Sequence, residues 1–200
     1  MNSYFKFSLP FKKVTFDFLF LSVLFLASFL IGILFYIKNP AESQEFINLL
    51  SDNLSDFNFE NPYLLTLQIF FNNLSVSFYS VLFGFFLGLV PLLIITLNGF
   101  LPGLLFPYVS SKKSAFFFIL GILPHGIFEI FAIILACALG FRMGRLSLIK
   151  IYGKTFGKID ISLTNEFFQS FFLYLYIVIP LLFIAAIIEV FITGFILSLF

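Results

Sequence analysis

The sequence predicts an all-α fold: a polytopic transmembrane helical bundle of about five membrane segments, one of them short or broken. Composition is the first reason, since 61% of the 200 residues are hydrophobic, 35 are phenylalanine, 10% are charged and the mean hydropathy is +1.12. Such a composition is typical of membrane proteins with several spans. Charge placement is the second reason, because most charged residues fall between long apolar runs.

The N-terminal part divides into three segments. Residues 1–15 contain three lysines and are predicted to be a cytoplasmic N-terminal segment. Residues 16–37 form an apolar run that is too long for a signal-peptide core and is followed by no small-residue cleavage site, so they are predicted to be a retained first transmembrane helix. Residues 38–61 carry five acidic residues and are predicted to be an extracytoplasmic acidic loop with room for a short helix.

The stretch from Asn61 to Ser111 has no charged residue. As one helix it would extend about 77 Å, more than twice the ~30 Å of a hydrocarbon core, so it must contain a turn. A turn at Gly88 to Pro91 would divide the run evenly, whereas Asn98-Gly99 has the stronger turn chemistry. The second choice would leave a short or broken crossing, interrupted by Pro102 and Pro107.

Residues 62–200 are predicted to form the membrane bundle, including a basic cytoplasmic loop at residues 142–166. With two crossings in the uncharged stretch, eight basic residues share the N-terminal side against three on the other, and the positive-inside rule favours this arrangement. The protein is therefore predicted to be a multi-pass cell-membrane protein with a cytoplasmic N-terminus and an extracytoplasmic C-terminus. The spacing of Lys150, Lys154 and Lys158 fits either a basic helix on the cytoplasmic leaflet or a solvated loop.

His125 and Glu129 lie in an otherwise apolar run and, four residues apart, would project from one face of a helix. Pro124 suits a first helical turn and would place His125 at the start of a helix that begins inside the membrane. Such a start could hold an anionic or polar ligand. A buried His–Glu pair that locks helix packing is an equal alternative. Zinc is poorly supported, because it needs three or four protein ligands and Glu189 is the one obvious further candidate.

Glu189 follows Ala185 and Ala186, whose small side chains would let a neighbouring helix approach and partner the acid, so we expect it to face His125 and Glu129. Asn73 and Asn98 add neutral hydrogen-bonding groups. Gly-x-x-x-Gly spacings permit close helix contact, and at least one of the three is expected by chance: Gly84 with Gly88, Gly99 with Gly103, and Gly140 with Gly144.

Several function classes are excluded or not supported. No nucleotide-binding loop, serine-nucleophile motif or metalloprotease helix is found, so we expect no catalytic residue, no enzyme activity, no cofactor and no metal. A net charge of +1 offers no field for nucleic acid. Cys137 is the single cysteine and is interpreted as a small core residue.

Several motifs together resemble the stage II sporulation protein M family of prokaryotic integral membrane proteins, over roughly Phe70 to Thr193. The most specific of them is Pro-His-Gly-x-x-Glu at residues 124–129. The others are Phe71-Asn72-Asn73, Gly84-x-x-x-Gly88, Leu97-Asn98-Gly99 with Gly103, and Ile184-Ala185-Ala186-Ile187-Ile188-Glu189. The resemblance places the following residues on family motif positions, without an established catalytic role: Asn73, Asn98, Gly99, Pro124, His125, Gly126, Glu129 and Glu189.

The resemblance implies a role at the cell envelope, where the sporulation member works with partners that remodel peptidoglycan; the family itself extends to archaea and does not imply sporulation. We therefore expect a non-enzymatic scaffold or partner-recruiting component, with the lipid bilayer and membrane or envelope proteins as partners and a homo-oligomer as an open alternative. The second hypothesis is a transporter or permease component, with a polar intramembrane site formed by His125, Glu129 and Glu189.

Overall fold

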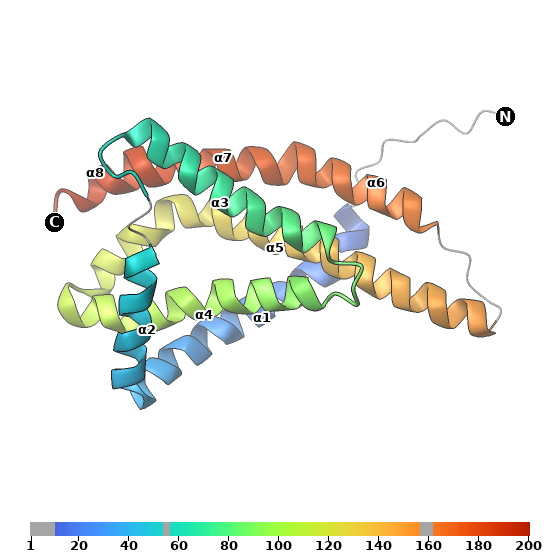
Figure 1. The fold of residues 1–200 in the computed structure, drawn as a ribbon, viewed down its shortest axis with the longest axis horizontal. Helices are drawn as coiled ribbons and strands as arrows, with labels where there is room; N and C mark the ends of the chain where they lie inside the picture. The colour runs from blue at the N-terminus through green and yellow to red at the C-terminus, as the bar shows by residue number, and fades with distance from the viewer. Residues whose placement is uncertain (1–10, 54–56, 157–161) are drawn as a thin grey trace.

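The computed structural model describes residues 11–53, 57–156 and 162–200, and all of its regular structure there is helical. The all-α prediction is confirmed. Figure 1 shows the helices, which are α1 (Phe11–Lys38), α2 (Pro40–Asn53), α3 (Pro62–Leu82), α4 (Leu89–Lys112), α5 (Ala115–Phe156), α6 (Leu163–Leu173), the π-helical η2 (Tyr174–Val178), α7 (Ile179–Ile187), the π-helical η3 (Ile188–Thr193) and α8 (Gly194–Leu197).

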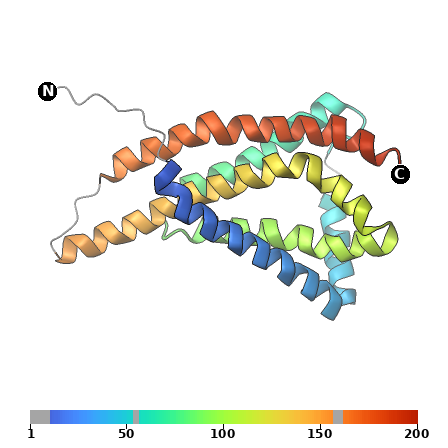
Figure 2. The same cartoon turned by 180° about the vertical axis from the view of Figure 1, so that it is seen from behind.

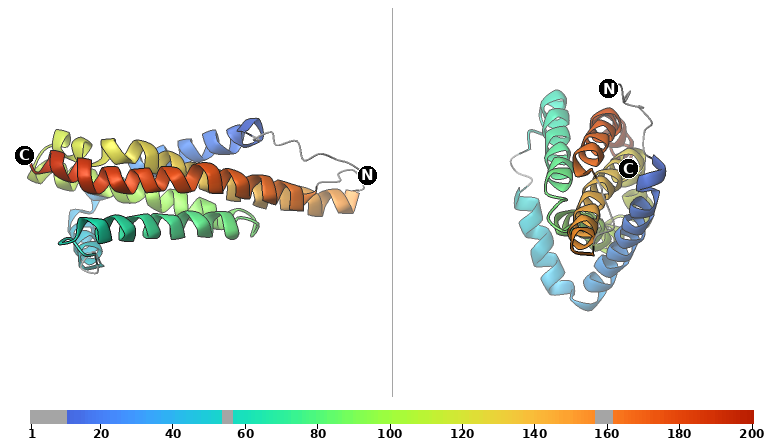
Figure 3. Two further views of the ribbon diagram at one scale, coloured as in Figure 1. Left: turned by 90° about the horizontal axis from the view of Figure 1, so that it is seen from above. Right: turned by 90° about the vertical axis from the view of Figure 1, so that its right-hand side faces the viewer.

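Five helices of the described chain are long and apolar enough to cross a membrane: α1, α3, α4, α5 and the continuous helix from α6 to α8. Their number agrees with the prediction, and the chain is a multi-pass membrane protein. Seen from either side, the five run along the length of the bundle in alternating directions (Figures 1 and 2). The short α2 lies roughly crosswise to them and forms a V with α1 in the end-on view of Figure 3.

The turn in the uncharged stretch lies at residues 83–88, beside the first of its two expected places. Gly88 has a φ angle of 73°, which glycine adopts without strain, and α4 begins directly after it. Leu87 before it also has a positive φ, 57°, which residues other than glycine adopt uncommonly. The alternative at Asn98-Gly99 is wrong, since both residues lie inside α4. The Asn98 amide donates to the Ile94 carbonyl at 2.9 Å, a bond made within the helix.

The expected short or broken crossing is not found. Instead α4 is a helix of 24 residues that contains Pro102 and Pro107. Proline is tolerated in membrane helices where neighbouring helices cover the backbone. Here α1 packs along α4 and supplies that cover, because Gly99 and Gly103 let the two backbones approach at Phe25 and Phe29.

The core of the bundle is α5, which packs against every other long helix. Residues 132–139 are all buried, and Cys137 among them is free and fully buried, as expected of a small core residue. A helix that is apolar on all sides is one that other helices surround. The predicted loop at residues 142–166 is corrected: α5 continues to Phe156 and α6 starts at Leu163, with residues 157–161 outside the described chain.

Each of the three Gly-x-x-x-Gly pairs takes part in a close contact, although Gly84 and Gly88 lie in the turn at residues 83–88 and not in a helix. Gly84 and Gly140 face each other, and a Cβ on either would collide with the backbone of the facing segment. Gly144 packs on the Gly88 turn. These contacts join α5 to the end of α3 and the start of α4 without intervening side chains, which is the geometry that small residues permit.

The arrangement of the helix ends leads to a prediction about membrane topology. Lys13 and Arg142 meet at one end of the bundle, whereas Lys38 and Lys112 end helices at the other. Lys6 and Lys158, which also entered the charge comparison, lie outside the described residues. By the positive-inside rule, the Lys13 end is expected to be cytoplasmic.

Reporters fused after Phe5 and after Phe200 are therefore expected on opposite sides of the membrane. An alkaline phosphatase fusion should be active at the C-terminus and inactive at the N-terminus, with a fluorescent cytoplasmic reporter giving the reverse pattern. Finding both ends on one side would contradict the five-crossing arrangement.

Candidate functional site: a polar cluster inside the membrane bundle

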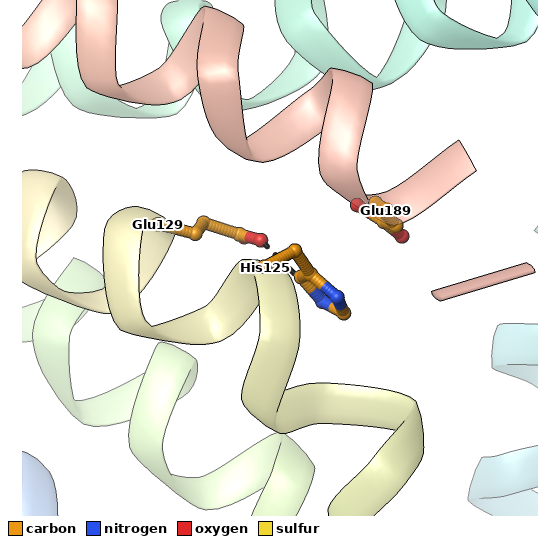
Figure 4. A group of neighbouring side chains, drawn as sticks. All are labelled: His125, Glu129 and Glu189. Carbon is orange, nitrogen blue, oxygen red and sulfur yellow. Dashed lines mark ion pairs between the residues drawn. The ribbon is translucent and has the colours of Figure 1, made fainter. Parts of the chain in front are cut away.

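His125, Glu129 and Glu189 come together between α5 and the α6–α8 helix. One ring nitrogen of His125 and one carboxylate oxygen of each acid all lie within 4.8 Å of one another. His125 Nε2 is 3.9 Å from Glu129 Oε2, and His125 Nδ1 is 3.2 Å from the Thr193 hydroxyl. Figure 4 shows the three side chains facing one space from two helices that are distant in sequence. The expectation that Glu189 faces the same interior as the other two is confirmed.

A bend in α5 presents His125 to this space. Proline has no N–H, so Pro124 leaves the Leu120 carbonyl without its helical bond and the helix turns there. Figure 4 shows α5 changing direction at His125. The prediction that His125 starts a helix is wrong, because α5 begins ten residues earlier, at Ala115, and continues through the proline. The site therefore has no helix N-terminus at His125.

Glu189 is presented by a local widening of its helix. It lies in η3, where the Gly194 N–H donates to the Glu189 carbonyl five residues back instead of four. Such π-helical segments place a side chain where a regular helix would not and are common at functional sites. On the preceding turn, Ala185 and Ala186 are fully buried, so the small side chains do allow the close approach that the sequence predicted.

The cluster lines a cavity of about 510 Å³. Asn73, on α3, belongs to the same wall as Glu129. Phe57 and Phe59, from the connection between α2 and α3, line the cavity as well, so it extends to that end of the bundle. The side chains of His125 and Glu129 are 11% and 23% exposed, which means that both are reachable from within the cavity although the bundle covers most of their surface.

The cluster lies deep between the helix ends. Along the helix axes, Asn73 is about 16 Å from the start of α3, His125 about 15 Å from the start of α5, and Glu189 about 12 Å from the end of α8. A hydrocarbon core is ~30 Å thick, so three helices independently place their polar residues near its midplane. None of the described residues that line the cavity is a lysine or an arginine. The two carboxyl groups therefore have a histidine and neutral groups as neighbours.

The comparison with known proteins identifies the family. The family model described as stage II sporulation protein M matches residues 21–194. The chain belongs to that family. It is also 34% identical over 145 residues to an uncharacterized protein of Methanocaldococcus jannaschii, an alignment that covers 72% of this chain and 76% of the relative. No solved structure matches the chain.

Three other predicted site residues of this stage II sporulation protein M family member lie away from the main cavity. Asn98 lines a second cavity of about 200 Å³ on the side of α5 that faces α1 and α4, and His125 and Glu129 line that cavity too. Gly126 is also part of its wall, where a Cβ would meet the Ile122 side chain at 3.0 Å. Gly99 takes no part in either cavity and serves the contact between α4 and α1. Asn98 is therefore separated from the Glu189 side of the cluster.

Sequence reasoning missed a second polar cluster in this family member, at the end of the bundle where Lys13 lies. Asp17 is fully buried in α1 and accepts two bonds from Arg145, from Nε at 3.0 Å and from Nη2 at 2.8 Å. Arg142 donates to the Lys13 carbonyl at 2.6 Å and to Glu166 Oε2 at 2.9 Å. The sequence prediction counts both arginines among the charges of a cytoplasmic loop. Their position at the end of a long apolar run, with Asp17 at the start of another, was the feature that could have indicated a buried ion pair.

Proposed function

We propose that this stage II sporulation protein M family member is a non-enzymatic membrane protein that binds a small polar or charged solute in its intramembrane cavity, as a component of a permease. One observation carries the proposal: His125 and Glu129 line both the 510 Å³ cavity and the 200 Å³ cavity. The polar pair thus lies where two neighbouring hollows meet, one lined by α3 and the C-terminal helix and the other by α1 and α4, and a solute moving from one to the other would pass it.

The depth and construction of the site support this function. Substrate sites of secondary transporters lie near the bilayer midplane and are formed by interrupted helices. In this chain the helix with His125 is bent at Pro124, and Glu189 lies in a π-helical segment. Ionisable residues inside membrane helices are costly and typically mark solute or ion pathways.

The absence of a suitable nucleophile among the described lining residues favours binding over catalysis. Thr193 is the hydroxyl nearest to His125, at 3.2 Å from Nδ1, but its residue is only 3% exposed and packs into the helix interface. A catalytic hydroxyl must be presented to a substrate and activated by a base that a third group orients. Here the hydroxyl is better placed to orient the imidazole than to attack a substrate.

Cysteine accessibility tests the proposal. In a Cys137→Ala background, His125→Cys is expected to react with a membrane-impermeant, charged thiol reagent, because the cavity would carry water to it. Ile127→Cys is the matched control, since Ile127 lies on the same turn of α5, is 61% exposed and points toward lipid, where a charged reagent does not react. Complete protection of position 125 in intact membranes would contradict a water-accessible site.

Protection would favour the second candidate, a scaffold or partner-recruiting component at the cell envelope. The observation behind this alternative is α2, which lies outside the five spans and crosswise to them. Ser43 and Ile47 on one face are buried, whereas Glu42 and Glu45 are exposed. An acidic helix held on the bundle in this way offers a surface for an envelope partner, and in that case the intramembrane cluster would serve helix packing alone.

A further inference from the structure

We propose that His125, Glu129 and Glu189 bind a divalent first-row transition-metal cation, of the class of Zn²⁺ or Mn²⁺. The inference rests on the proposed binding function and names the ligand of the same site. The sequence argued against zinc because zinc needs three or four protein ligands and Glu189 was the one obvious candidate beyond His125 and Glu129. The structure brings Glu189, 60 residues after Glu129, beside the other two, and three protein ligands are the number found in open metal sites.

The distances are compatible with one ion. With metal–nitrogen and metal–oxygen bonds of about 2.0–2.2 Å, three ligand atoms on one ion lie about 3–3.8 Å apart. His125 Nε2 and Glu129 Oε2, at 3.9 Å, are close to this spacing. The widest separation in the group, within 4.8 Å, requires a closure of about 1–1.5 Å, which rotation of a glutamate side chain provides.

The surrounding residues hold the ligands as they do in known metal sites. A metal-bound histidine usually uses its other ring nitrogen to bond a neighbouring group, and a metal-bound carboxylate is itself hydrogen-bonded. Thr193 bonds Nδ1 of His125, which leaves Nε2 directed at Glu129. Asn73, on α3, lines the same cavity wall as Glu129 and brings an amide to that side of the site. Both residues belong to helices other than α5, so the tertiary fold places them around the ligands.

Charge gives the reason for a cation. Two carboxyl groups lie near the midplane of the bundle, and none of the described residues that line their cavity is a lysine or an arginine. Uncompensated charge at that depth is strongly unfavourable, and a divalent ion would neutralise it. An imidazole among the ligands favours Zn²⁺, Mn²⁺ and related ions over Mg²⁺, which prefers an octahedral shell of oxygens.

The test is metal binding by the purified full-length protein, with every affinity tag removed. His125 is the only histidine in the sequence, so the tag-free protein has a single imidazole. We expect one equivalent of Zn²⁺ or Mn²⁺ in equilibrium dialysis and broadening of the one pair of imidazole NMR signals by Mn²⁺. Magnesium in large excess should not compete.

Variants sharpen the test. Glu189→Gln is expected to weaken binding at least tenfold and Thr193→Val about tenfold. Glu45→Gln, an exposed acid on α2, should bind like the natural protein and serves as the matched control. The wild-type titration stands by itself if a variant fails to fold. Absence of saturable binding to the natural protein, or unchanged binding by well-folded Glu189→Gln, would overturn the proposal.

The two proposals can fail separately. Labelling of His125→Cys without metal binding would keep the solute-binding function and remove the metal. Stoichiometric metal binding by the natural protein, with position 125 protected from the charged reagent, would keep the metal site and remove the permease.

Discussion

Asp17→Ala is expected to destabilise the bundle strongly and to lower the yield of folded protein. The Asp17 carboxylate is fully buried and is held by both arms of the Arg145 guanidinium, at 3.0 and 2.8 Å. Removing one partner of a buried pair leaves the other charge without compensation, which costs about 3–5 kcal/mol. Arg145 is 36% exposed, so water relieves part of its charge and the lower end of that range is expected. A loss of this size is a large share of the 5–15 kcal/mol that typically stabilises a domain.

The measurement is the yield of monodisperse protein in mild detergent, together with its thermal unfolding midpoint. Lys13→Met is the matched control, because Lys13 also forms an ion pair at this end, with Glu166 at 2.9 Å, but its side chain is 48% exposed. An exposed pair contributes about 0–1 kcal/mol. Equal destabilisation by the two changes would show that burial does not decide the contribution of these pairs.

A double substitution distinguishes the loss of the whole ion pair from the loss of one partner. Asp17→Leu with Arg145→Leu removes both charges and leaves apolar side chains of moderate size. Replacing a whole buried pair by apolar residues is often neutral, whereas breaking it is not. The double variant is therefore expected to be more stable than Asp17→Ala. If it is as unstable as the single variant, the packing of these side chains matters more than their charges.

The intramembrane cluster could be found from the sequence because ionisable residues are rare in apolar runs. His125, Glu129 and Glu189 were recognised in this way, and the small residues beside Glu189 predicted its direction. The distances between the three side chains could not be predicted from the sequence, because they depend on the bend at Pro124 and on the π-helical segment around Glu189. Both features change the path of a helix locally, and a prediction based on a regular period of 3.6 residues assumes that the path is straight.

The wrong predictions concern residue types that suit more than one structural role. Asn98 and Gly99 are favourable in turns, but in α4 the amide bonds a carbonyl of its own helix and the glycine allows α1 to approach. Asp17 and Arg145 are 128 residues apart, and although each stands at the end of an apolar run, neither segment indicates that the two form a pair. In both cases the tertiary contact, which sequence patterns do not carry, decided the role of the residue.

Gly140→Ala is expected to destabilise the bundle although it adds a single methyl group to a helix. At this position α5 lies directly on α3, and the new Cβ would overlap the Ser80 carbonyl oxygen and lie 2.9 Å from the Ser80 carbonyl carbon and 3.0 Å from Pro91 Cγ. Two of these three atoms belong to backbone and cannot move away by rotating a bond. Overpacking typically costs 1–3 kcal/mol, so about 3 kcal/mol and a midpoint lower by roughly 6–12 °C are expected.

Gly121→Ala is the matched control for this change. Gly121 lies in the same helix, but a Cβ there would meet only the Leu197 methyl groups, at 3.7 and 3.8 Å, which is ordinary contact. Alanine favours a helix over glycine by up to about 1 kcal/mol at both positions, so the difference between the variants isolates the contact between α5 and α3. Thermal unfolding in one detergent should place Gly121→Ala at or above the natural protein and Gly140→Ala well below it. Similar midpoints for the two variants would mean that the helices separate easily at Gly140, and the backbone contact there would not be what holds α3 against α5.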